Sequence, residues 1–312
     1  MTPDEFRHRL SRGPLVIDGG LATQLESAGH DIGGSLWSAR VLRDDPAAVR
    51  DAHIAFLAAG AELIITASYQ VSRRGLIEVG SSAREADQLL VRSVQLANEA
   101  REQALADGVS QPGALVAASV GPWGATNHDG SEYRGRYGVP RRELVAFHRE
   151  RLEPLVAAAP DLLAVETIPD LDEVEALIEA LSDYPDLAAW ISLTTPDGRT
   201  VSAGQPLGDV AHVVASCPSV VAVGVNCSAA DHVLAAVEAL APAGLPLLAY
   251  PNAGQVWDAE SEQWHGPAAP VLPAALPPLW LAAGVRVVGG CCGVGPEGIS
   301  ELATMTAGWH SD

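Results

Sequence analysis

The alternation of short apolar segments with helical segments is the feature that most limits what this 312-residue chain can fold into. Most of the apolar segments lack an apolar/polar alternation, which is typical of parallel strands that are covered on both faces. Eight segments of this kind are predicted as strands, at residues 14–20, 61–70, 114–122, 161–169, 188–196, 220–228, 246–254 and 285–293.

The segments between the strands have the spacing of helices. Residues 45–60, 81–108 and 171–184 place apolar side chains on one helical face, and several such segments begin at an acidic residue or a Ser or Asp cap and end at Gly or Pro. Eight strand–helix units predict an α/β fold, a single (β/α)8 TIM barrel domain over residues 1–312. A doubly wound open sheet is the main alternative. It is disfavoured because the first strand lacks a GxGxxG turn and no composition break divides the chain.

The composition narrows the classes of partner. A hydrophobic content of 48% is enough for a large core. The net charge of −20 argues against nucleic acid as a partner and suits a cationic small molecule, although acidic surface residues also keep proteins in solution. The N-terminus is charged, and no run of about 18 apolar residues follows, so we expect a cytoplasmic protein without a membrane partner. One sequence does not specify the oligomeric state.

Polar residues collect at the carboxyl ends of the predicted strands. Active sites of (β/α)8 barrels lie at these ends, so we expect the residues to converge on one site. Any one of Ser68, Gln70 and Asn252 is equally well explained as a cap or a strand end. The residues concerned are Asp18, Ser68, Gln70, Glu166, Asn226, Cys227, Asn252, Cys291 and Cys292.

Two of the four cysteines are adjacent, in the segment VRVVGGCCGVG at residues 285–295. The sixth and eighth strands lie two apart around a barrel, so Cys227 is expected to meet Cys291 and Cys292 and to hold zinc with them. Adjacent residues of a strand point to opposite faces, and both can bind only if the backbone leaves extended geometry. Gly289, Gly290 and Gly293 are expected to give it that freedom. A vicinal disulfide and a pair of inert buried thiols are the alternatives. Cys217 is predicted to be a packed thiol on the opposite side of the barrel.

A zinc ion with three protein ligands keeps one position open. A substrate thiol entering that position would lose its proton at neutral pH and remain nucleophilic. This chemistry favours transfer of an electrophilic carbon to sulfur. No Ser-His-Asp order, HExxH motif or P-loop offers a competing reaction.

Motifs along nearly the whole chain, from about residue 14 to 303, resemble the homocysteine S-methyltransferases. The pair formed by GVNC and GGCC is highly specific. The matching segments are DGGLATQLE (18–26), ITASYQ (65–70), SVGPWG (119–124), DGSEYRG (129–135), ETIPDLDEVEAL (166–177), GVNCS (224–228), YPNAGQVWD (250–258) and GGCCG (289–293).

The resemblance implies a zinc-dependent (β/α)8 barrel that methylates homocysteine to methionine. Cys227, Cys291 and Cys292 would hold zinc. Asp18, Gly19 and Glu166 would bind the amino-acid end of homocysteine, where a carboxylate can pair with an ammonium group. Asn226 is the weaker assignment, as a neighbour that orients substrate or supports a ligand. No catalytic residue beyond the zinc ligands is predicted.

Within the resemblance, the chain looks most like the branch that uses a sulfonium donor, S-methylmethionine, with S-adenosylmethionine as a second donor. Trp123, Tyr133 and Tyr137 are candidates to receive the sulfonium by cation–π attraction, with loop packing as the plainer explanation. Two alternatives stay open. One is a barrel that binds zinc or a thiol, for storage or sensing, without turnover. The other is a methyltransferase that uses betaine or acts on another thiol.

Overall fold

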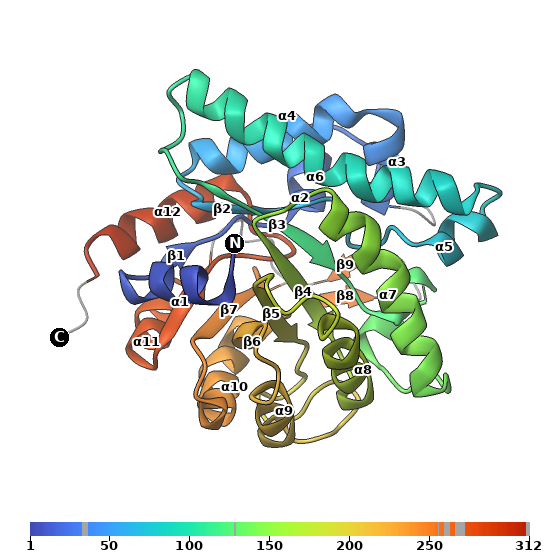
Figure 1. Cartoon of the computed structure of the whole chain (residues 1–312). Coiled ribbons are helices and arrows are strands. Elements are labelled where there is room, and N and C mark those ends of the chain that lie inside the picture. Colours follow the sequence, from blue (N-terminus) through green and yellow to red (C-terminus); the bar gives the residue numbers. More distant parts are fainter. Residues whose placement is uncertain (33–36, 128, 255, 259–262, 266–271, 310–312) are drawn as a thin grey trace.

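The computed structural model describes residues 1–32, 37–127, 129–254, 256–258, 263–265 and 272–309 (Figure 1). Its main element is one sheet of eight parallel strands in the order β1-β10-β7-β6-β5-β4-β3-β2. The strands are β1 (Leu15–Val16), β2 (Leu63–Ile65), β3 (Leu115–Val120), β4 (Leu162–Ile168), β5 (Ala189–Leu193), β6 (Val220–Ala229), β7 (Leu247–Asn252) and β10 (Val285–Val288).

The two edges of this sheet meet and close it into a barrel. A parallel bridge pairs Ile17 with Leu63. The Asp18 N–H donates to the Leu63 carbonyl at 3.1 Å, and the Glu62 N–H donates to the Val16 carbonyl at 2.8 Å. The predicted (β/α)8 barrel is therefore confirmed. Seven of the eight barrel strands lie inside their predicted ranges, and β6 extends one residue beyond its range, to Ala229.

Helices surround the strands on the outside (Figure 1). The three helical segments predicted from apolar spacing correspond to α4 (Pro46–Ala58), α6 (Ala83–Ala106) and α8 (Leu171–Leu181). A short antiparallel pair, β8 (Val256–Asp258) and β9 (Gln263–His265), lies in the connection between β7 and α11. The α-helices are α1 (Pro3–Ser11), α2 (Leu21–Ser27), α3 (Trp37–Asp44), α4 (Pro46–Ala58), α5 (Arg73–Glu78), α6 (Ala83–Ala106), α7 (Arg141–Ala157), α8 (Leu171–Leu181), α9 (Leu207–Val214), α10 (Val233–Leu240), α11 (Leu276–Ala282) and α12 (Pro296–Ala307).

Helix α1 covers the amino-terminal end of the barrel. Thr2 begins the helix with a capping box, in which its side chain accepts from the Glu5 N–H. Phe6, on the inner face of the helix, packs against Trp190 of β5 with ring centroids 6.4 Å apart. The Ala188 N–H, directly before β5, donates to the Met1 carbonyl at 3.1 Å. Apolar packing thus closes this end, and the polar strand ends lie at the other.

Strand geometry decides which side chains face the barrel interior. Along β4, Leu162 and Ala164 pack with the interior residues, whereas Leu163 and Val165 pack with the outer helices. Successive side chains of a strand alternate between its faces, so Glu166 continues the interior row. Among the described helices, none combines the length and the apolar character needed to cross a membrane.

Candidate functional site

The carboxyl ends of the strands enclose a cavity of about 130 Å³. All seven residues that the sequence predicts as ligands or substrate contacts line it: Asp18, Gly19, Glu166, Asn226, Cys227, Cys291 and Cys292. Gln70 lines it as well. Ser68 does not; it is fully buried and donates to the Ser119 carbonyl at 2.8 Å. Asn252 is buried outside the lining.

Three cysteine side chains converge in this cavity. Their Sγ atoms all lie within 4.8 Å of one another. The Sγ of Cys292 is 3.7 Å from that of Cys227 and 4.0 Å from that of Cys291. Two sulfurs bound to one tetrahedral zinc at 2.3 Å would lie about 3.8 Å apart, so the spacing fits a metal ion. All four cysteines are free thiols, and Cys217 is buried beside Ser219, separate from the cluster.

The vicinal pair follows β10, which ends at Val288, so neither cysteine belongs to the regular strand. Gly293 has a φ of +81°, as the prediction of glycine freedom requires. For Gly289 and Gly290 that reason is wrong, because neither has a left-handed φ. They are needed for close packing. A Cβ on Gly289 would lie 2.3 Å from the Ile17 side chain, and one on Gly290 would lie 2.3 Å from Val294.

Two residues with left-handed backbone break the strand alternation at the cavity. Cys227 has a φ of +47° and Thr167 has a φ of +64°. In a regular strand each would face away from its predecessor, Asn226 or Glu166. Here both members of each pair line the cavity. A non-glycine residue in this region costs free energy, and surrounding contacts must hold it.

The Asn226 side chain provides such contacts. Its Oδ1 accepts from the Thr167 N–H and from the Ser192 hydroxyl, both at 2.8 Å. Its Nδ2 donates to the Thr167 Oγ1 at 2.8 Å. Asn226 therefore connects the turn after Glu166 to the turn at Cys227. All three hydrogen bonds are made inside the protein.

The carboxylates of Asp18 and Glu166 lie in the same cavity and are buried. Asp18 accepts from the Ile65 N–H at 2.8 Å, and Glu166 accepts from the Ser119 hydroxyl. Burial raises the pKa of Glu166 to about 7 and raises the pKa of Asp18 well above its usual range. Both groups lack a basic partner among the residues that line the cavity. A ligand with a positive charge would supply one.

Known proteins are similar to this chain along almost its whole length. The homocysteine S-methyltransferase family model matches residues 15–306. The chain belongs to the homocysteine S-methyltransferase family. A homocysteine S-methyltransferase of Escherichia coli is 45% identical over 291 residues, which span 92% of this chain and 94% of that protein. The homocysteine S-methyltransferase YbgG of Bacillus subtilis is 39% identical over 303 residues, 96% of each chain.

A solved structure of this family has the same fold. It is the homocysteine methyltransferase MmuM of E. coli in its metallated form, with a TM-score of 0.85 and 42% identity over 94% of this chain and 96% of that one. The relatives are named as methyltransferases, so this chain is assigned to an enzyme family. The matched range, residues 15–306, spans the positions of all seven predicted site residues.

Two residues of the loop between β3 and α7 also line the cavity. Tyr133, one of the three aromatic candidates, lines it, and its hydroxyl is 3.1 Å from the Cys227 Sγ. Glu132 also lines it and was not predicted. An acidic residue between glycines in DGSEYRG is the signal that could have indicated it. Trp123 and Tyr137 are not among the lining residues.

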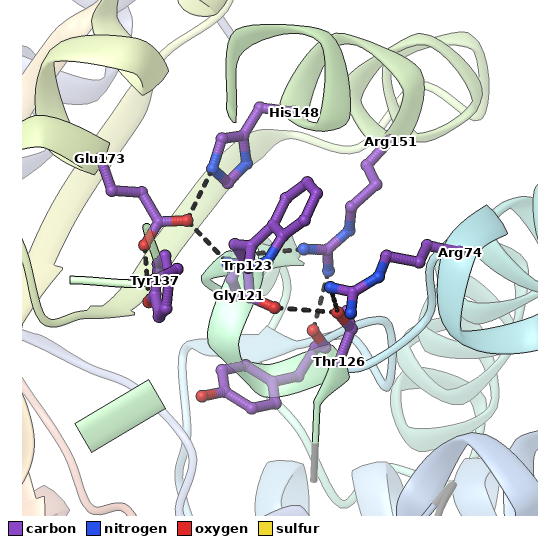
Figure 2. Close-up of polar contacts among 9 residues, drawn as sticks. Arg74, Gly121, Trp123, Thr126, Tyr137, His148, Arg151 and Glu173 are labelled. Carbon is purple, nitrogen blue, oxygen red and sulfur yellow. Dashed lines mark hydrogen bonds and ion pairs between the residues drawn. The ribbon is translucent and has the colours of Figure 1, made fainter. Parts of the chain in front are cut away.

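A buried polar network, the Glu173 network, holds this loop from outside the barrel (Figure 2). Glu173 of α8 accepts from the Trp123 N–H at 2.6 Å, from the Tyr137 hydroxyl at 2.9 Å and, in the tautomer with a proton on Nε2, from His148 at 3.0 Å. Arg151 of α7 is fully buried and donates to three carbonyls at the ends of β2 and β3, those of Gly121, Ser68 and Tyr69. The network fixes the loop whose next turn carries Glu132 and Tyr133.

Proposed function

We propose that this protein transfers a methyl group from a sulfonium donor to the thiol of homocysteine, giving methionine. The observation that carries the proposal is the convergence of three thiols and two buried carboxylates in one cavity of a chain that belongs to the homocysteine S-methyltransferase family. The three thiols would hold the metal ion that binds the reacting sulfur of homocysteine. The two carboxylates would pair with its ammonium group.

We propose zinc as the cofactor, with Cys227, Cys291 and Cys292 as ligands. The sulfur spacing fits a tetrahedral ion, and three thiolates are a donor set that zinc favours. The metallated form of E. coli MmuM also supports a metal in this family. When bound, zinc would lower the pKa of the homocysteine thiol so that the thiolate is the reacting form at neutral pH.

The remaining residues bind and orient the substrates. Asp18 and Glu166 would pair with the homocysteine ammonium, since each is a buried carboxylate without a basic neighbour among the lining residues. Gly19 lines the same cavity, and a Cβ there would lie 2.3 Å from the Val294 carbonyl oxygen, so this position has no room for a side chain. Asn226 would keep Glu166 and Cys227 in place through Thr167. Alignment of the two substrates in a water-poor cavity supplies a large part of the acceleration of such a transfer.

The charge of the cavity favours a cationic donor. No arginine, lysine or histidine is among the lining residues, which include three carboxylates. We propose S-methylmethionine as the donor, with S-adenosylmethionine as a second. We also propose that residues 1–312 act as one domain, because the cavity uses residues from β1 to the segment after β10, and that the protein works in the cytoplasm, where its thiols stay reduced.

One incubation series tests the proposal. Purified protein is loaded with zinc and incubated with homocysteine and, in turn, S-methylmethionine, S-adenosylmethionine and betaine, and the methionine formed is measured. We expect most product from S-methylmethionine. Product from betaine alone would overturn the donor. Binding of zinc and homocysteine without product from any donor would favour a storage or sensing protein.

A further inference from the structure

Glu132 is a buried carboxylate that the proposed reaction has not yet used. It lies in the short helix η2 (Ser131–Tyr133) and is 5% exposed. Its Oε2 is buried and has no hydrogen-bond partner. The residue lines the cavity, and its carboxylate interacts electrostatically with Cys227. Arg134 attracts this carboxylate electrostatically, but its guanidinium pairs with Asp129 at 3.6 Å, so Glu132 Oε2 is left for a cationic ligand to pair.

The fold holds Glu132 in this place. The Ser131 hydroxyl, directly before it, donates to the Gly124 carbonyl at 3.2 Å, and the Gly135 N–H donates to the Ser131 carbonyl at 2.9 Å. A Cβ on Gly124 would lie 2.5 Å from the Glu132 backbone nitrogen, so the two segments of the loop that contain these residues are in contact. The Glu173 network holds the first part of the same loop, at Trp123 (Figure 2). These contacts within the loop fix the position of Glu132.

The carboxylates of the cavity fall into two groups by their origin. Asp18 and Glu166 follow barrel strands and are assigned to the ammonium of homocysteine. Glu132 comes from a separate loop, next to Tyr133, whose hydroxyl contacts the Cys227 sulfur. A second positive charge near the sulfur cluster would thus meet Glu132. In the proposed reaction the methyl donor carries that charge on the sulfur that loses the methyl group.

We propose that Glu132 is the counter-ion for the positive sulfur of the donor and that it selects a sulfonium over a neutral thioether. This inference rests on the proposed function and adds a residue that determines donor specificity. The interaction is a charge-assisted contact in a cavity of low water content.

The change of charge on the donor sulfur during the reaction determines which kinetic constant Glu132 affects. A lone pair of the homocysteine thiolate forms the new carbon–sulfur bond. The carbon–sulfur bond of the donor breaks, and its electron pair stays on the donor sulfur, which becomes a neutral thioether. The positive charge beside Glu132 therefore fades in the transition state. A contact that is strongest in the ground state lowers KM for the donor and does not raise kcat.

Steady-state kinetics of Glu132→Gln test this assignment, with Glu143→Gln as the control. Glu143 is exposed in the first turn of α7, so its substitution changes the net charge equally and leaves the cavity intact. We expect Glu132→Gln to raise KM for S-methylmethionine about 10- to 100-fold, with kcat unchanged or raised because the lost contact is weaker in the transition state, and with KM for homocysteine and zinc content unchanged. A rise in KM for homocysteine alone would overturn the proposal and assign Glu132 to the acceptor.

Equilibrium binding separates the sulfonium from the ammonium, because S-methylmethionine and methionine both carry the ammonium and differ in the charge on sulfur. We expect wild type to bind S-methylmethionine more tightly than methionine and Glu132→Gln to bring the ratio of dissociation constants close to one. An unchanged ratio in the variant would refute the assignment. If wild type forms no methionine from any sulfonium, the proposed function fails instead, and the two failures are thereby distinguished.

Discussion

Two groups of buried charged side chains lie on either side of the loop between β3 and α7, and they differ in how well they are paired. In the Glu173 network, both carboxylate oxygens of Glu173 accept hydrogen bonds, and Arg151 donates to three carbonyls. In the cavity, Glu132 Oε2 has no partner, and Asp18 and Glu166 have no basic neighbour among the lining residues.

The difference teaches how to separate supporting residues from ligand-binding ones in this fold. Burying a charge costs free energy unless the protein pairs it. In the Glu173 network the protein itself pairs the Glu173 carboxylate and the terminal nitrogens of Arg151, although His148 Nδ1 and Arg151 Nε have no partner. The paired carboxylate and guanidinium therefore support the loop. We propose that a metal ion pairs the cavity thiols and that cationic substrates pair the cavity carboxylates. Each prediction below sets a residue of one group against one of the other.

The largest effect is expected at the thiols of the cavity. Cys291→Ala removes one of three proposed zinc ligands, so we expect loss of bound zinc. We also expect the rate of methionine formation to fall by more than about 100-fold, which is the upper limit for loss of a residue that only supports a metal ligand. The zinc content, the rate and the circular dichroism are measured together. Cys217→Ala is the matched control and should keep both zinc and activity. Full activity with bound metal in Cys291→Ala would refute the site.

The same substitution at two buried glutamates tests the comparison directly. Glu173→Gln places an amide where three donors converge, so we expect the free energy of unfolding to fall by about 3 kcal/mol. Glu132→Gln removes an unpaired charge, and we expect it to leave this free energy unchanged or to raise it. Urea unfolding measures both. Equal losses in the two variants would remove the distinction between the groups.

Asn226→Ala tests a residue that lines the cavity but is paired by the protein itself. It would leave the Thr167 N–H and the Ser192 hydroxyl unpaired, so we expect a loss of about 1–3 kcal/mol in stability and a 10- to 100-fold fall in kcat/KM. A rise in KM for homocysteine at unchanged stability would instead support direct substrate contact, as the sequence predicts for this residue.

The smallest effect concerns histidines and pH. His148 has Glu173 as a partner, whereas both ring nitrogens of buried His53 have none, and burial lowers the pKa of His53 to about 4. The unfolded chain, with a pKa near 6.5, then binds more protons below that pH than the folded chain does. Stability is therefore complete above pH 6.5 and is lost as the pH falls toward 4, by about 2 kcal/mol at pH 5. Urea unfolding of wild type and His53→Gln at pH 7 and pH 5 measures this effect. The loss of free energy of unfolding between the two pH values should be about 2 kcal/mol smaller in the variant.

Much of the site could be predicted because strand ends are local features. Asp18, Glu166, Asn226 and the three cysteines each follow an apolar segment, and closure of the barrel brings such ends together. The same reasoning could not assign Ser68 or Gln70, since one faces the Ser119 carbonyl and the other the cavity. It also missed Glu132, because the place of a loop residue depends on contacts such as that of Ser131 with Gly124.

The sequence by itself determined the eight barrel strands and the residues at their carboxyl ends, because hydrophobic periodicity and motif spacing are local properties of the chain. The additional strands β8 and β9 were not predicted. Tertiary structure decided which of those residues share a cavity and which are already paired. It also decided that Gly289 and Gly290 serve close packing, while Cys227 and Thr167 adopt left-handed backbone. The physical reason is that burial and hydrogen bonding depend on neighbours distant in the chain, which no local pattern specifies.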